Sequence, residues 1–220
     1  MNRADGSPRA SFRREDLLLY AVTDRRWLQG KSLAEAVRES LQGGVSIVQL
    51  REKEMHGETL RREADKIKAV CRSFQVPFLV NDDVETALAV GADGVHIGQE
   101  DMSAVEARRL LGDGKILGVS AQTVAQAKEA EAAGADYLGV GAVFATGTKA
   151  DAQDVSIDTL KEICRAVTIP VAAIGGITKE NLPLLLGTGI AGAAVVSAIF
   201  AQPDIERASR ELREILKGAD

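Results

Sequence analysis

Short runs of apolar, often β-branched residues alternate along the chain with longer stretches in which apolar residues recur at helical spacing. Apolar residues at successive positions of a short run are typical of a strand that is covered on both faces. The stretches between the runs predict amphipathic helices. We therefore predict eight strands, at residues 18–22, 46–50, 78–80, 94–97, 116–119, 137–140, 171–174 and 193–196.

The predicted helices carry recognisable start and end signals. Ser103 with Glu106, and Thr123 with Gln126, have the spacing of a capping box. Glycine closes the helices in "LAVGADGVHI", "EAAGADYLGV" and "LLGTGIAGAAVV", and a strand follows each time. Strands that alternate with helices pair in parallel.

Eight such units predict an α/β fold, a single-domain (β/α)8 TIM barrel near the lower size limit of that architecture. The alternative is an open doubly wound sheet. That fold usually has fewer strands at this length, and no GxGxxG motif follows the first strand here.

Composition and charge narrow the classes of partner. The chain has 220 residues, 45% of them hydrophobic, and a net charge of -5, which argues against nucleic-acid binding. No apolar run approaches the length of a membrane span, so we predict no membrane partner and a cytoplasmic location. Residues 1–15 are polar and are predicted to form a flexible N-terminal tail, with the barrel at 16–220. Cys71 and Cys164 are predicted to be small buried thiols.

Polar residues gather where the predicted strands end, which is where the active sites of such barrels lie. These residues are Gln49, Arg51, Lys53, Asn81, Asp82, His96, Gln99, Asp101, Ser120, Thr146, Thr148 and Lys149. Gln49, Arg51 and Lys53 share one side of the second strand by alternation. They predict an anion clamp, because Arg is a planar fork for phosphate oxygens and Lys a point charge. The alternative is an internal salt-bridge network with acids from neighbouring strands.

The last two strands predict a phosphate site. Gly175 and Gly176 follow the seventh strand and Ser197 follows the eighth, the two places where this fold commonly binds phosphate. The alternatives are a tight turn and a helix cap. The segment "ATGTKAD" after the sixth strand is interpreted as a lid or binding loop, or else as a plain surface loop.

Asp82 and Asp101 form a candidate metal pair, because they follow adjacent strands and offer hard oxygen ligands, as Mg²⁺ prefers. Helix capping is the alternative, and we assign that role to Asp83. His96 is predicted to be a packed, hydrogen-bonded residue. Two anion sites that face each other, one of them beside a metal, indicate the joining of two phosphorylated molecules.

The motifs "VQLREK", "VNDDVETAL", "ADGVHIGQED", "LGVSAQT", "YLGVGAVFATGTK", "AAIGGIT" and "AVVSAIF" together resemble the thiamine-phosphate synthase family over about residues 17–212. The resemblance implies a (β/α)8 transferase that joins a hydroxymethylpyrimidine diphosphate to a thiazole phosphate, or its carboxylated precursor, and releases pyrophosphate. The diphosphate would depart to leave a pyrimidine methylene cation, which the thiazole nitrogen captures.

The resemblance also assigns roles to individual residues. It implies a pyrimidine diphosphate site made of Gln49, Leu50, Arg51, Glu52, Lys53, Asn81, Ser120 and Lys149. Arg51, Lys53, Ser120 and Lys149 would be catalytic, with Lys149 closing its loop over the diphosphate. The thiazole phosphate would bind to Thr146, Gly147, Thr148, Gly176, Val196 and Ser197, and one Mg²⁺ per active site to Asp82 and Asp101. Ala142 and Ala145 stand where many members have proline, which would loosen the loop. The resemblance is compatible with a homo-oligomer.

Three other functions remain open at this point. A related thiazole tautomerase would use a His just after the fifth strand, where this chain has Gln122. A non-catalytic phosphate-binding barrel would not need Asp82, Asp101 and Lys149. A sugar-phosphate epimerase would need a fuller set of proton-transfer groups than two histidines provide.

Overall fold

Eight parallel strands close into a barrel in the computed structural model, which describes residues 12–28, 30–145 and 155–218. Each strand pairs with the next one along the chain, and the last pairs with the first. The strands are β1 Leu19–Val22, β2 Ile47–Leu50, β3 Phe78–Asn81, β4 Gly94–Ile97, β5 Ile116–Ala121, β6 Tyr137–Val140, β7 Val171–Ile174 and β8 Gly192–Val195. The predicted barrel is therefore confirmed, with strand ends displaced by at most two residues.

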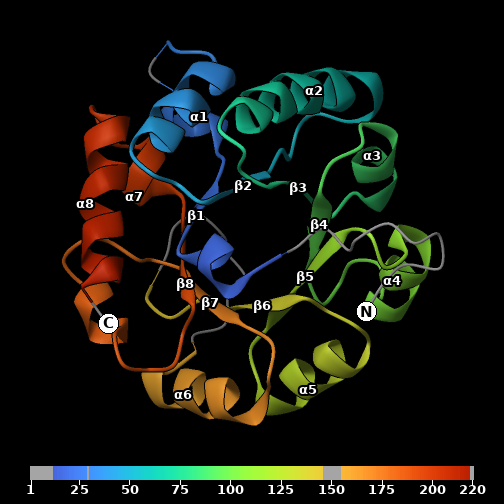
Figure 1. Ribbon diagram of the computed structural model, residues 1–220, viewed down its shortest axis with the longest axis vertical. Helices are drawn as coiled ribbons and strands as arrows, with labels where there is room; N and C mark the ends of the chain where they lie inside the picture. The colour runs from blue at the N-terminus through green and yellow to red at the C-terminus, as the bar shows by residue number, and fades with distance from the viewer. Residues whose placement is uncertain (1–11, 29, 146–154, 219–220) are drawn as a thin grey trace.

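The helices form a ring around the barrel, as Figure 1 shows. The α-helices are α1 Leu33–Gln42, α2 Gly57–Ser73, α3 Val84–Ala89, α4 Ala104–Leu111, α5 Val124–Ala132, α6 Ile157–Ala166, α7 Ser197–Phe200 and α8 Ile205–Lys217. The described residues also include three 3-10 turns, namely η1 Arg14–Leu17, η2 Arg25–Trp27 and η3 Leu182–Leu185. None of the helices in the described part of the chain is long and apolar enough to cross a membrane.

The core has two layers, because alternate strand residues face opposite sides of the sheet. Residues such as Val48 and Leu50 face outward and pack under the helices. The inward positions are in register around the barrel, so that Gln49 pairs with Leu79 and Asn81 with His96. The floor of the interior is apolar, and its upper inward positions carry the polar residues.

The N-terminal segment is shorter than predicted. Residues 12–15, which we placed in a flexible tail, are folded against the barrel. The Arg14 guanidinium donates to the carbonyl oxygens of Gly189 and Ile190, at 3.1 and 2.9 Å. Leu17 is fully buried in the barrel interior. η1 thus covers the end of the barrel opposite the βα loops (Figure 1), and residues 1–11 lie outside the described residues.

The start signals of the helices are confirmed. Ser103 and Thr123 are N-caps, and their side chains accept from the third residue of α4 and α5. The second half of the box is formed at neither helix, because the Glu106 carboxylate accepts from the Arg109 guanidinium and Gln126 Oε1 accepts from the backbone N–H of Gln122 at 2.8 Å. The sequence pattern therefore located both helix starts.

Both cysteines are free and shielded by packing. Cys71 is buried in α2 and Cys164 is half-buried in α6. Burial raises the pKa of the Cys71 thiol to about 12 and that of Cys164 to about 11. We expect the folded chain to react with a disulfide reagent at pH 8 about a hundredfold more slowly than the urea-unfolded chain, because the thiolate is the reactive form. One thiol reacting at the unfolded rate would contradict this expectation.

Candidate active site

A chain of hydrogen bonds crosses the barrel interior. Gln49 Nε2 donates to the Tyr20 hydroxyl at 2.5 Å, and the hydroxyls of Tyr20 and Tyr137 are 2.7 Å apart. His96 Nδ1 lies 2.9 Å from the Tyr137 hydroxyl, and its Nε2 lies 3.0 Å from Ser120 Oγ. The two polar residues at the ends of this chain, Gln49 and Ser120, are both predicted site residues. Their positions are therefore fixed by one connected network.

The aromatic side chains of the network are held in a tight space. Burial raises the pKa of Tyr20 and that of Tyr137, so both phenols keep their protons. A Cβ atom on Gly118 would lie 2.1 Å from the Tyr137 ring, and one on Gly139 would lie 2.9 Å from His96. These glycines leave the volume that the aromatic rings occupy. The prediction that His96 is a packed, hydrogen-bonded residue is confirmed.

Arg51 and Lys53 follow β2, and we call these two residues the β2 clamp. The Arg51 backbone N–H donates to Thr23 Oγ1 at 3.0 Å, which ties this loop to the end of β1. Within residues 12–28, 30–145 and 155–218, no acid forms an ion pair with either side chain of the clamp. Their charges are thus available to an anion. Leu50 packs outward under the helices, so only its backbone can reach the barrel mouth.

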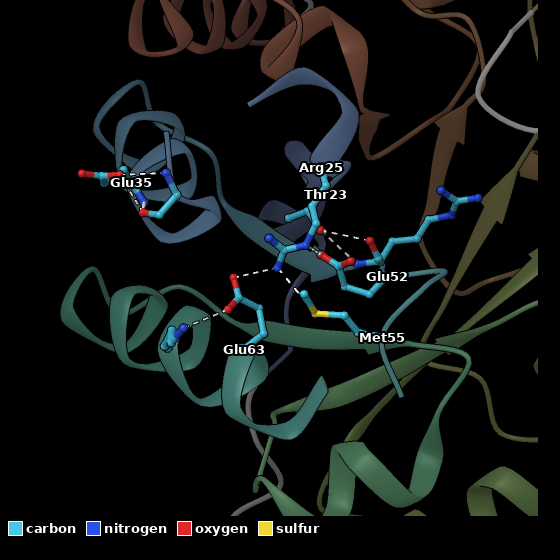
Figure 2. Close-up of polar contacts among 9 residues, drawn as sticks. Thr23, Arg25, Glu35, Glu52, Met55 and Glu63 are labelled. Atoms are coloured by element: carbon cyan, nitrogen blue, oxygen red, sulfur yellow. Dashed lines mark hydrogen bonds and ion pairs between the residues drawn. The ribbon is translucent and has the colours of Figure 1, made fainter. Parts of the chain in front are cut away.

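Glu52, between the two clamp residues, is paired with Arg25 (Figure 2). Its side chain is 5% exposed, and its Oε1 lies 2.8 Å from Arg25 Nε. Arg25 also forms an ion pair with Glu63 of α2 at 2.9 Å. The internal salt bridge that was the alternative for the clamp is therefore made by Glu52 instead, with Arg25 of the first βα loop.

The three residues Asn81, Asp82 and Asp83 have different structural surroundings. Asp83 is the N-cap of α3 and accepts from the Thr86 N–H at 2.7 Å, as predicted. Asp82 has a φ of 63°, which is uncommon for a residue with a side chain. Its N–H donates to the His96 carbonyl oxygen at 2.8 Å, and the Asn81 amide donates to its carboxylate. Unusual backbone conformation of this kind occurs often at functional sites.

The donor set on this side of the barrel fits Mg²⁺. Asp101 lies in the loop after β4, which neighbours the loop that contains Asp82. Its Oδ2 accepts from the Gly98 N–H at 2.6 Å. Both side chains are carboxylates from neighbouring loops and carry the hard oxygen atoms that Mg²⁺ prefers. Among the residues that the structure describes, no three or more His, Cys, Asp or Glu side chains are grouped to hold a metal. A Mg²⁺ ion here would complete its shell with water and substrate oxygens, as is usual for this ion.

The opposite side of the barrel mouth is built from glycine backbone. Gly176 has a φ of 60°, and a Cβ atom there would lie 2.4 Å from the Ala145 carbonyl oxygen. Asn181 Nδ2 donates to the Gly176 carbonyl at 2.9 Å and so fixes this turn. Val196 follows β8, and Ser197 is the first residue of α7. Gly176, Val196 and Ser197 thus all follow the ends of the last two strands, as predicted.

We expect Gly176→Ala to lower the free energy of unfolding by about 1–3 kcal/mol. An alanine is strained at the positive φ of this position, and its methyl group would clash with a backbone oxygen. Urea unfolding followed by circular dichroism measures this change. Gly187→Ala is a control for the backbone conformation alone, because its φ is 78° and a Cβ atom there meets nothing within 4 Å. Equal losses in the two variants would show that the close approach at Gly176 is unimportant.

Four predicted residues, Thr146, Gly147, Thr148 and Lys149, lie outside the described residues. The part of the same loop that is described packs on the β7 turn, since the Phe144 N–H donates to the Gly175 carbonyl at 3.1 Å. A cavity of about 720 Å³ lies elsewhere, between η1 and α2, and is lined by Phe12, Lys68, Arg72 and Asp93 among others. It is at the end of the barrel away from the predicted site residues.

Sequence reasoning missed the contribution of the first βα loop. Thr23 and Arg25 hold the loop after β2, but no role was assigned to the polar segment "TDRR" that follows β1. Its place at the carboxyl end of a strand was the available signal. The tyrosines were also missed, because Tyr20 and Tyr137 are indistinguishable from apolar core residues in a strand pattern. Asn181 was missed too, because the sequence shows only that it is a polar residue soon after Gly176.

Comparison with known proteins places these features in a family. The family model described as thiamine monophosphate synthase matches residues 19–199. A thiamine-phosphate synthase of Ruminiclostridium cellulolyticum is 50% identical over 91% of this chain and 95% of that protein. Another from Clostridium novyi is 48% identical over 90% of this chain and 97% of its own length.

A solved structure agrees with the sequence relatives. The thiamine phosphate pyrophosphorylase from Pyrococcus furiosus superposes with a TM-score of 0.87 at 40% identity, over 94% of this chain and 98% of that one. The similarity covers the whole barrel, and with it every strand end described above. The chain belongs to the thiamine monophosphate synthase family, and it is a transferase of thiamine biosynthesis.

Proposed function

We propose that this chain condenses a hydroxymethylpyrimidine diphosphate with a thiazole phosphate to give thiamine phosphate and pyrophosphate. The observation that carries the proposal is the convergence of two kinds of group at one end of the barrel. The cations of the β2 clamp, which form no ion pair within the described residues, lie on the same side as Asp82 and Asp101. The glycine turn after β7 and the start of α7 lie across the barrel mouth.

The pyrimidine would lie over the hydrogen-bonded network of the barrel interior, against Gln49, Asn81 and Ser120. Gln49 uses its amide N–H toward Tyr20, which leaves its carbonyl oxygen as an acceptor for a ring substituent. Ser120 is held by His96 and offers a hydroxyl at the same level. These neutral groups suit an uncharged heterocycle and fix its orientation.

The reaction would proceed by breakage of the bond between the pyrimidine methylene carbon and the diphosphate oxygen. The bonding electron pair leaves with the diphosphate, and the thiazole nitrogen supplies the pair for the new carbon–nitrogen bond. Arg51 and Lys53 would stabilise the charge that develops on the leaving group, together with Lys149. The protein then needs no nucleophile, and positioning of the second substrate completes its task.

Bound Mg²⁺ would add neutralising charge on the diphosphate side. Asp82 and Asp101 would hold the ion, and Gly98 and Asn81 orient those two carboxylates by hydrogen bonds. The thiazole phosphate would bind opposite, at Gly176, Val196, Ser197 and residues 146–148. Separation of the two anion sites keeps the two negatively charged substrates from repelling one another at close range.

The experiment that tests the proposal supplies the purified chain with both phosphorylated heterocycles and Mg²⁺. We expect thiamine phosphate and pyrophosphate to form in equal amounts, measured by chromatography and by a coupled phosphate assay. Omission of either substrate is the control. Absence of both products above background, with the protein folded, would refute the proposed reaction.

A further inference from the structure

An acidic residue inside an anion clamp requires an explanation. Glu52 stands between Arg51 and Lys53 in sequence, and a carboxylate beside a diphosphate site would repel the ligand or pair with the cations that should bind it. The structure shows how this is avoided. Its side chain is 5% exposed and is turned toward α2, where Arg25 meets it (Figure 2).

Arg25 connects three parts of this region. Its guanidinium lies 2.8 Å from Glu52 and 2.9 Å from Glu63, and it donates to the Met55 sulfur at 3.7 Å. A planar guanidinium with several donors suits such a branched contact better than an ammonium does. Arg25 itself lies in η2, directly after β1, where Asp24 caps the turn through the Arg26 N–H at 3.0 Å. A rigid first loop thus presents the arginine to the second.

The two acids that Arg25 contacts do not depend on it equally. Glu63 has a second cation, Lys66, at 3.2 Å. In the part of the chain that the structure describes, the ion pairs of Glu52 are confined to Arg25. Burial raises the pKa of Glu52, and the Arg25 charge opposes that rise. Without Arg25, the cations closest in sequence to this carboxylate are Arg51 and Lys53.

We infer that Arg25 is a positioning residue for the diphosphate site: it holds the Glu52 carboxylate on the helix side of the loop, so that the β2 clamp remains free to bind an anion. Thr23 supports the same arrangement, because its hydroxyl accepts from the Arg51 N–H at 3.0 Å. The inference rests on the proposed function for the identity of the anion. It assigns Glu52 to the support of the site rather than to direct contact with substrate.

The test measures binding of pyrophosphate in the presence of Mg²⁺ by isothermal titration calorimetry. We expect Arg25→Gln to weaken binding about tenfold, because the freed Glu52 carboxylate then competes with pyrophosphate for the clamp. The double variant Arg25→Gln/Glu52→Gln removes that carboxylate, and its binding is expected to return to within about threefold of the wild type. Arg62→Gln is the matched control, since Arg62 pairs with Glu58 on the exposed face of α2.

Three results of this titration would overturn the inference. If the pyrophosphate affinity of Arg25→Gln equals that of Arg62→Gln, Arg25 has no effect on the site. A double variant as weak as Arg25→Gln would show that Arg25 acts by some route other than neutralising Glu52. A wild-type chain that does not bind pyrophosphate also contradicts it. A wild-type chain that binds pyrophosphate but makes no thiamine phosphate would refute the proposed function alone.

Kinetics separate positioning from a general loss of structure. Arg25→Gln is expected to raise KM for the pyrimidine diphosphate about tenfold and to leave KM for the thiazole phosphate within about twofold. Equal rises in both would indicate a general structural defect and would contradict the inference. If Arg25→Gln fails to fold, Arg25→Lys replaces it, because an ammonium reproduces the fork only in part. Its pyrophosphate binding is expected to be about threefold weaker, and binding equal to the wild type would overturn the inference.

Discussion

Replacing Asp82 with asparagine is expected to lower kcat/KM for the pyrimidine diphosphate about a hundredfold to a thousandfold, because a charged ligand for Mg²⁺ is lost where the leaving group departs. Asparagine is a sharper replacement than alanine at this position. It tolerates the φ of 63° that the backbone adopts, so the loop should keep its shape. The steady-state rate at several Mg²⁺ concentrations measures the effect, and an unchanged Mg²⁺ dependence would contradict the metal assignment.

Asp83 provides the control from the adjacent residue. Its carboxylate accepts from the Thr86 N–H and from the Thr86 hydroxyl, both at 2.7 Å, and so belongs to the start of α3. Asp83→Ala is expected to lower the free energy of unfolding by about 0.5–2 kcal/mol and to leave Mg²⁺-dependent turnover nearly unchanged. Loss of activity in the Asp82 variant and loss of stability in the Asp83 variant would distinguish the roles of two adjacent acids that look alike in sequence.

Arg51→Met should reduce kcat/KM about a hundredfold and change the free energy of unfolding by less than about 1 kcal/mol. The reason is that the described structure assigns the Arg51 side chain no ion pair whose loss would destabilise the fold, while its backbone bonds to Thr23 survive the substitution. Methionine preserves much of the aliphatic stem. Rate measurements and urea unfolding on the same preparation test both parts.

A control substitution of another arginine tests whether the loss of activity is specific to Arg51. Arg207 pairs with Glu211 at 2.8 Å on the exposed surface of α8, so Arg207→Met removes one positive charge at a distance from the clamp. We expect that variant to retain wild-type kcat/KM. An Arg51→Met enzyme that is as active as Arg207→Met would show that the clamp does not bind the diphosphate.

The barrel could be predicted from sequence because each strand is buried on both faces and therefore has a continuous apolar run. The errors have physical causes. β5 extends to Ala121, two residues beyond its predicted end, because the polar Ser120 lies within the strand and bonds to His96 across the interior. The predicted tail was too long, because the ordering of residues 12–15 depends on long-range contacts such as those of Arg14 with Gly189.

The site could be predicted to the extent that its residues follow strand ends. Alternation placed Gln49 on one side of its strand, and that side faces the interior, where Gln49 bonds to Tyr20. Asp83 was assigned to the helix start, and it is the N-cap of α3. Alternation could not show which partner a side chain contacts when its residue lies beyond the end of the strand. Glu52 is paired through Arg25, a residue 27 positions away, and nothing in the local pattern specifies that contact.

The bond between the first two βα loops also limits how this barrel can be altered by exchange of parts. A graft that replaces residues 51–56 with the corresponding loop of another barrel would leave Arg25 facing Glu63 without its second acid. A graft of the first loop alone would remove Arg25 and leave the buried Glu52 carboxylate without its ion pair. Recombination that keeps both segments from one parent should therefore yield more folded and active chimeras than recombination that divides them.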